Sequence, residues 1–169
     1  LYPPELSCDW DNDGLMVCPD KTAEITKVLV SLDATEGAIA AARKAGAQLL
    51  LTHHPIIFRP IKSLIADNVT ASRAIAAYQS GISVISLHTR LDIGNGGVND
   101  ALASRIGLCD IECFGDSETP TLGRIGSISE MTLAEFAETV KNALGAVSAS
   151  FVGNLPVRRV AVVGGDGND

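Results

Sequence analysis

Two adjacent histidines and a third further along the chain are the residues best suited to chemistry in this sequence. His53 and His54 follow the apolar run LLLT and precede Pro55, whereas His88 follows the apolar run ISVISL. Asp92 stands four positions after His88, so one helical turn or a tight loop would aim both side chains at one point. Neutral imidazole nitrogens and carboxylate oxygens are typical ligands of divalent transition metals. We therefore interpret His53, His54, His88 and Asp92 as candidate metal ligands.

A structural role is the alternative for these histidines. A buried His-His pair could hydrogen-bond backbone groups, and His88 could be a surface residue. Neighbours in a strand point to opposite faces, so His53 and His54 converge only if the backbone turns there, and Pro55 favours such a turn. All 3 histidines of the chain follow predicted strands, and this common position favours the metal site.

The segments that must position these residues alternate between strand and helix patterns. Continuous apolar runs predict buried strands, and helical stretches that end near glycine predict helices. In chain order we expect a strand at 27–33, a helix at 35–44, a strand at 48–52, a helix at 67–79, a strand at 82–87 and a helix at 98–106. This order predicts an α/β fold with a mainly parallel sheet flanked by helices, whose ligands lie beyond the carboxyl ends of the strands.

A loop at residues 113–123 indicates a boundary between two parts of the chain. Beyond it the patterns predict a strand at 124–127, a helix at 132–144 capped near Ser129 or Thr132, and strands at 146–152 and 158–163. The chain stops on a glycine loop directly after a strand. We therefore expect a metal-binding α/β lobe at residues 1–116 and the start of a second α/β lobe at 117–169, truncated at its C-terminus.

Other acidic and glycine-rich stretches have weaker functional interpretations. DWDNDG at residues 9–14 matches the start of a calcium loop, but Pro3 and Pro4 before it and Pro19 within the rest of that loop disfavour such a site. We expect Trp10 to anchor a turn there, with the acids solvated or capping the turn, or one of them approaching the substrate. Asp33 is expected to orient a ligand histidine. The glycine loops at 94–100 and 164–169 are incomplete as phosphate-binding motifs and are expected to be turns.

Composition and charge exclude several classes of protein. The 169 residues carry a net charge of −7 and no run of Lys or Arg, so we expect no nucleic-acid partner. The apolar segments are far shorter than the roughly 20 residues that span a bilayer, and no signal peptide is recognisable. We expect no membrane association and a cytoplasmic location. The 4 cysteines are expected to be reduced thiols rather than disulfides or zinc ligands.

Several motifs occur together in a fixed order along the chain. They are WDNDGLMV at 10–17, SLDAT at 31–35, LLLTHHPIIFRPIKSL at 49–64, SLHTRLDIGNGGVNDALASRIGL at 86–108, GRIG at 123–126 and VAVVGGDG at 160–167. Together they resemble the Ngg-interacting-factor-like family, dinuclear metal centre proteins also known as GTP cyclohydrolase I type 2 homologues. The resemblance covers nearly the whole chain, and its most specific motifs are His-His-Pro and His-x-x-x-Asp.

This resemblance implies that His53, His54, His88 and Asp92 bind two divalent metal ions such as Fe, Mn, Zn or Mg. Asp92 would bridge the ions, and a later His-x-x-x-Glu pair would complete their coordination. No histidine follows His88 in this sequence, and we expect the chain to be a fragment that begins late and ends early. The resemblance also implies two interlinked α/β lobes and a homo-oligomer, commonly a ring-shaped hexamer.

Two ions held close together suit hydrolysis, because they activate a bridging water and polarise a substrate oxygen or imine. We therefore expect a metal-dependent hydrolase of a small-molecule substrate. Opening of a guanine-nucleotide ring, as the family name suggests, and cleavage of a phosphate or amide bond all fit such a centre. The alternative is a non-catalytic metal-binding protein with a regulatory or scaffold role.

Overall fold

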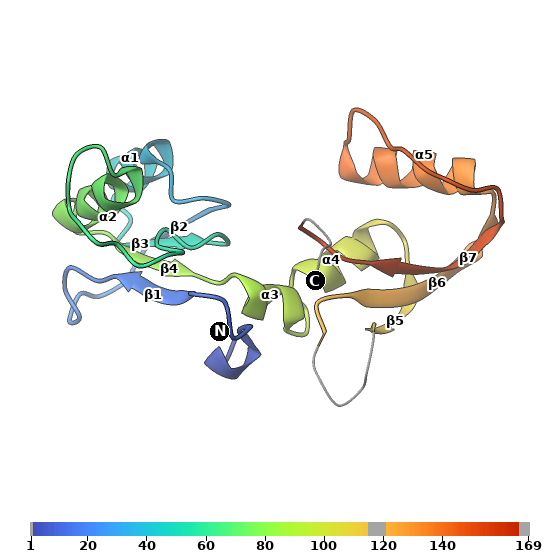
Figure 1. The fold of residues 1–169 in the computed structure, drawn as a ribbon, viewed down its shortest axis with the longest axis horizontal. Coiled ribbons are helices and arrows are strands. Elements are labelled where there is room, and N and C mark those ends of the chain that lie inside the picture. Colours follow the sequence, from blue (N-terminus) through green and yellow to red (C-terminus); the bar gives the residue numbers. More distant parts are fainter. Residues whose placement is uncertain (1, 115–120, 166–169) are drawn as a thin grey trace. The chain divides into compact units, whose positions relative to one another are not determined.

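The chain folds into two compact units, residues 1–91 and 92–169 (Figure 1). The computed structural model describes residues 2–114 and 121–165. The first unit contains a short 3-10 turn, Pro4–Leu6, and the elements β1 (Gly14–Val17), β2 (Val28–Ser31), α1 (Glu36–Ala45), β3 (Leu49–Thr52), α2 (Val69–Gln79) and β4 (Ser83–Ser86). The second contains α4 (Val98–Arg105), β5 (Cys109–Cys113), β6 (Arg124–Met131), α5 (Leu133–Leu144) and β7 (Val157–Val162). The division falls within the short helix α3 (Thr89–Ile93).

The sheet of the first unit has the order β1-β4-β3-β2, in which β2, β3 and β4 are parallel and β1 is antiparallel to β4. The prediction of a mixed α/β fold with a mainly parallel sheet is thus confirmed for this unit. Ser31 lies opposite Thr52 and Thr52 opposite Ser86, so the three parallel strands end at one level. The residues that follow these strands therefore emerge along the same edge.

Both long helices of this unit lie over the same face of the sheet (Figure 1). The chain crosses from β2 to β3 and from β3 to β4 in the same direction, and right-handed crossovers then place α1 and α2 together. Each helix starts at a polar cap, since Thr35 accepts from the N–H of Ala38 and Asn68 from that of Ala71. The core between helices and sheet is small and apolar, and includes Ile39, Ala42, Leu50, Ala77, Ile82 and Val84.

The prediction that residues 27–33 form a buried strand is wrong. Strand β2 occurs there but is the edge strand of its sheet, and Val30 is 73% exposed. Leu29 packs against the apolar core, whereas Val28 and Val30 point to the face of the sheet opposite the helices. Both of these valines are exposed. A continuous apolar run therefore identified the strand correctly but not its burial.

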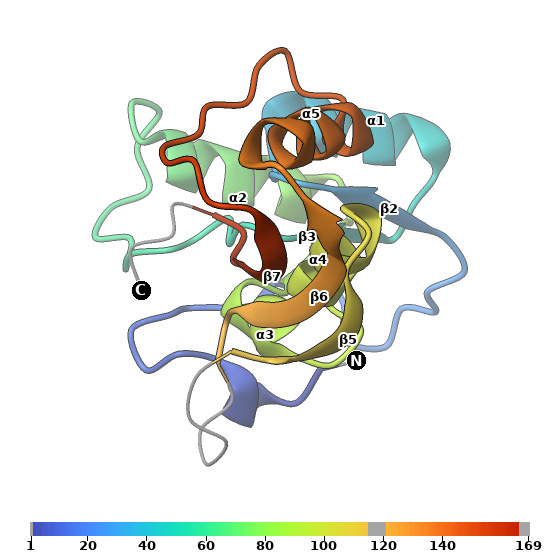
Figure 2. The ribbon, with the colours of Figure 1, turned by 90° about the vertical axis from the view of Figure 1, so that its right-hand side faces the viewer.

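The second unit has an antiparallel sheet of order β5-β6-β7 (Figure 2), which the sequence did not predict. The helix predicted at 132–144 is confirmed, and Thr132 and Glu135 form a reciprocal capping box at its start. The strand predicted at 146–152 is wrong, because these residues are irregular and Val152 is 99% exposed. The predicted loops at 113–123 and 164–169 lie partly outside the described residues. Among the described helices, none is both long and apolar enough to cross a membrane.

A buried arginine organises the second unit. Arg124 is 1% exposed, and its guanidinium donates to both carboxylate oxygens of Asp100, at 2.6 and 3.2 Å. It also donates to the carbonyl oxygens of Ile93 at 2.7 Å and of Thr121 and Gly123 at 3.1 Å. The loop before α4 and the start of β6 are thereby tied together, and the guanidinium charge is compensated.

Acid should remove this stabilisation. Burial by itself raises the pKa of Asp100, but hydrogen bonds from Arg124 and from the N–H of Gly96 outweigh it, so the pKa lies below its ordinary value. A carboxylate with a depressed folded pKa contributes stability above its unfolded pKa of about 3.9, and loses it as the pH falls through the folded pKa. We expect Asp100→Asn to destabilise the protein at pH 7 and progressively less below pH 4, measured by urea unfolding beside the exposed control Asp9→Asn. A difference between wild type and Asp100→Asn that stays constant down to pH 2 would contradict this assignment.

Candidate metal centre

The three histidines meet at the carboxyl edge of the parallel strands. His53 and His54 directly follow β3, and His88 lies two residues beyond β4. Their ring centroids are 5.0, 5.3 and 5.8 Å apart, and one nitrogen of each ring lies within 4.8 Å of the other two. Imidazole nitrogens gathered in this way could hold a metal ion.

The chain bends at His53 and His54, directly before Pro55, which brings both rings to one side. The bend is fixed through the backbone of His54, whose N–H donates to the carbonyl of Leu32 at 3.0 Å. Its carbonyl oxygen lies 2.9 and 3.3 Å from the hydroxyls of Thr52 and Ser86, which are 2.8 Å from each other. Two buried strand-end hydroxyls therefore position the residue that turns out of the sheet.

The rings of His53 and His54 are each held at Nδ1 by a different hydrogen-bond acceptor. Nδ1 of His54 donates to a carboxylate oxygen of Asp33 at 2.8 Å, as predicted for that acid. Nδ1 of His53 donates to the carbonyl oxygen of Leu87 at 3.2 Å. A carboxylate and a carbonyl can only accept, so both rings carry their proton on Nδ1 and their lone pair on Nε2.

The third ring is held by a residue from the start of the chain. Nδ1 of His88 donates to Asp11 at 2.8 Å, and Asp11 also accepts from the N–H of Thr89 at 3.1 Å and from its hydroxyl at 2.6 Å. Burial by itself raises the pKa of Asp11, but these hydrogen bonds from Thr89 and His88 outweigh it, so the pKa lies below its ordinary value. The ionised carboxylate thus fixes the lone pair of His88 on Nε2 as well.

The motif DWDNDG supplies structural anchors. The expectation that its acids are solvated is wrong for Asp11 and Asp13, whose side chains are buried. Asp13 receives a two-pronged hydrogen bond from the buried guanidinium of Arg90. Gly14 has a φ of +100°, and a Cβ there would stand 3.3 Å from Arg90, so glycine suits this position. Trp10 packs edge-on against His88, with centroids 6.1 Å apart.

Asp92, the fourth predicted ligand, lies in α3, the helix that begins directly after His88. The division between the two units falls between Leu91 and Asp92, so Asp92 belongs to the second unit. There its carbonyl oxygen accepts a hydrogen bond from Asn99 at 3.3 Å. The role of the Asp92 carboxylate as a metal ligand stays a prediction.

Sequence reasoning missed two of the three ring anchors, Asp11 and the carbonyl of Leu87. Asp11 is 77 positions away from His88, and its motif was read locally, as a calcium loop or a turn. The motif that contains Asp11 is part of the same family resemblance as the histidine motifs. That shared resemblance was the available signal for Asp11, since residues of separate motifs often share one site. A backbone carbonyl leaves no signal in side-chain identity.

Removal of the Asp33 carboxylate should weaken metal binding. Asp33→Ala deprives the exposed ring of His54 of its anchor, and we expect an affinity loss of about 10–100-fold. Asp33→Asn keeps an accepting oxygen and should lose less. Chelator competition would measure the affinity, with Glu24→Ala as an exposed control that makes the same change in charge. Equal losses in Asp33→Ala and Glu24→Ala would point to a general charge effect.

Known proteins resemble this chain over nearly its whole length. The family model described as Duf34/NIF3 (NGG1p interacting factor 3) matches residues 1–169. A relative from Clostridium perfringens named GTP cyclohydrolase 1 type 2 homolog is 34% identical, with 100% of this chain and 66% of that protein aligned. A relative of the same name from Lactococcus lactis is 36% identical, over 98% of this chain and 65% of that protein.

Among solved structures, a hypothetical protein of Staphylococcus aureus matches with a TM-score of 0.87 and 28% identity. The match covers 98% of this chain and 68% of that protein. Against both named relatives, the chain spans just under two thirds of their length.

Proposed function

Because the chain belongs to the Duf34/NIF3 family, we propose that His53, His54, His88 and Asp92 bind two divalent metal ions and that the protein is a metal-dependent hydrolase. The observation that carries this proposal is the common anchoring of the three imidazoles through Nδ1. Histidine ligands of metals typically donate their other ring N–H to a carboxylate or a carbonyl, which fixes the tautomer and the orientation of the ring.

The donor set fits a transition metal. Three imidazole nitrogens favour Zn, Fe or Mn over Mg, which prefers oxygen ligands. The carboxylate of Asp92 would add an oxygen ligand to these three nitrogens. Two bound ions supply an activated water and a Lewis acid for a substrate oxygen.

The histidine cluster is partly exposed, most of all at His54. The side chain of His54 is 47% exposed and that of His88 is 19% exposed, so a small molecule can approach from the side of His54. Asp11 and Asp33 hold the rings through hydrogen bonds and would keep them in place during a reaction. Trp10 and Phe58 each pack edge-on against His88, with ring centroids 6.1 Å away.

The names of the relatives suggest one candidate reaction, the hydrolytic opening of a guanine-nucleotide ring. Cleavage of a phosphate or amide bond fits the same ligands. By resemblance, we further propose that the protein has two interlinked α/β lobes and assembles as a homo-oligomer such as a hexamer. A cytoplasmic location stays a proposal from the sequence.

A substrate screen of the full-length protein tests the proposal. The protein would be loaded with Mn, Fe or Zn, its metal content measured, and guanine nucleotides, phosphoesters and amides offered as substrates. We expect turnover that requires metal and disappears in the His53→Ala/His54→Ala variant. Metal binding without turnover on any substrate would instead favour a regulatory or scaffold role, and failure to bind metal would overturn both roles.

A further inference from the structure

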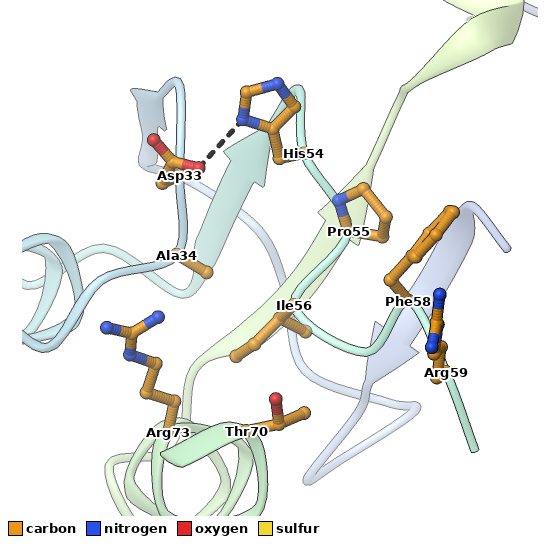
Figure 3. Close-up of a pocket in the computed structure, with 9 residues that line it drawn as sticks. All are labelled: Asp33, Ala34, His54, Pro55, Ile56, Phe58, Arg59, Thr70 and Arg73. Carbon is orange, nitrogen blue, oxygen red and sulfur yellow. Dashed lines mark hydrogen bonds and ion pairs between the residues drawn. The ribbon is translucent and has the colours of Figure 1, made fainter. Parts of the chain in front are cut away.

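A pocket of about 340 Å³ opens beside the histidine cluster (Figure 3). His54 belongs to both, since its ring is part of the cluster and also lines the pocket. The remaining wall comes from the residues after β2, the loop after β3 and the first turns of α2, and its polar members are Asp33, Arg59, Thr70 and Arg73. A ligand seated here would have one end next to the proposed metal centre.

Arg73 is the unusual member of this wall. Of the described arginines, three are not exposed: Arg73, Arg90 and Arg124. Arg90 is paired with Asp13 and Arg124 with Asp100, as expected for guanidinium groups removed from water. Arg73 has no such carboxylate within the described ranges, and its Nε is buried without a hydrogen-bond partner there. A half-buried cation that lacks its counter-charge is costly unless a ligand supplies one.

Other groups around the pocket also favour an anion. Thr70 stands in the first turn of α2, an 11-residue helix, where backbone N–H groups and the helix dipole favour negative charge. Arg59 adds a second guanidinium on the opposite wall (Figure 3). The carboxylate of Asp33 lies at the end of the pocket next to His54, to which it is hydrogen-bonded. The pocket therefore carries one excess positive charge in a chain whose net charge is −7.

We propose that this pocket binds a phosphate group through Arg73 and Thr70, with Arg59 adding positive charge on the far side. The inference rests on the proposed function, because it assigns the phosphate to the substrate that the histidine cluster processes. A phosphate carries more negative charge than a carboxylate, and guanidinium groups and helix N-termini both favour it. The volume leaves room for the part of the molecule that carries the phosphate, and that part would extend past His54.

Calorimetric titration of the full-length, metal-loaded protein with inorganic phosphate tests this site. We expect saturable binding, weakened about tenfold or more by Arg73→Gln, because a charge-assisted hydrogen-bond partner is lost. Arg73→Lys keeps the charge without the fork and should bind with intermediate affinity. Arg105→Gln, an exposed position in the second unit, controls for the change in charge and should bind as wild type does.

Stability separates a ligand-binding arginine from a structural one. Without phosphate, Arg73→Gln should unfold at the same temperature as wild type or higher, because it removes an unpaired cation. Phosphate should raise the unfolding temperature of wild type more than that of Arg73→Gln. Equal phosphate affinities of wild type and Arg73→Gln, a clearly lower unfolding temperature of Arg73→Gln without phosphate, or tighter binding of acetate than of phosphate would each overturn the proposal.

Two further arms separate this inference from the proposed metal centre and identify the source of the phosphate. Arg73→Gln should keep the metal content of wild type, whereas His53→Ala, at a position that does not line the pocket, should lose metal and still bind phosphate. Phosphate binding without any metal binding would therefore leave the pocket standing and remove the metal centre. Tighter binding of glycerol phosphate than of inorganic phosphate supports a phosphate carried by a substrate, and the reverse order overturns that assignment.

Discussion

Replacement of His53 and His54 together by alanine should lower the affinity of the full-length protein for Zn or Mn by more than about 100-fold. Loss of an outer hydrogen-bond partner alone costs about 10–100-fold, and this variant removes two of the imidazoles themselves. Metal analysis after dialysis should show that metal content falls in proportion. Chelator competition would give the change in affinity.

The fold should survive this double substitution. The ring of His54 is about half exposed, and the bend at this point is held by backbone groups of His54 rather than by its ring. Circular dichroism should therefore be unchanged. Lys62→Ala/Ser63→Ala, two adjacent exposed positions in the same unit, is the matched control and should keep the metal of wild type. Full metal content in the double histidine variant would refute the assignment of the cluster.

Replacement of Arg124 by alanine should lower the free energy of unfolding by about 3–5 kcal/mol, the range for a broken buried ion pair. The substitution leaves Asp100 without its counter-charge and leaves the carbonyl oxygens of Ile93, Thr121 and Gly123 without their donor. It also empties the space of a large buried side chain. Urea unfolding at pH 7 would measure the loss.

Arg159→Ala is the matched control for Arg124→Ala. Arg159 also pairs with a carboxylate across the second unit's sheet, at 2.6 Å from Glu112, but both side chains are more than 60% exposed. Exposed pairs contribute about 0–1 kcal/mol, so Arg159→Ala should have little effect. Equal losses in Arg124→Ala and Arg159→Ala would show that burial does not decide the strength of these pairs.

The parts of the fold that local patterns specify could be predicted. The carboxyl ends of β3 and β4 were predictable because each apolar run is followed by a histidine. The placement of the histidines at one edge then followed from the parallel topology. The role of Asp33 was predictable for the same reason, since it lies at the end of a neighbouring strand.

What depends on distant partners could not be predicted. The run 146–152 has the composition of a strand, but an apolar segment becomes a strand only where another strand is available to pair with it. The sequence predicts solvated or turn-capping acids at Asp11 and Asp13, because the groups that pair with them, His88 and Arg90, come from the other end of the unit. The same limit hides Arg73, whose buried Nε lacks a hydrogen-bond partner among the residues that the structure describes.

The anchoring of the three imidazoles has a consequence for the entropy of metal capture. A ring on an unrestrained side chain must give up its rotational freedom when an ion arrives, and that loss opposes binding. Here the rotational freedom of the three histidine rings is already lost on folding, because a hydrogen-bond acceptor fixes each ring. The three acceptors come from three separate segments of the chain. The site is therefore rigid before any ion enters it, and a lost anchor would return that entropic cost to the binding step.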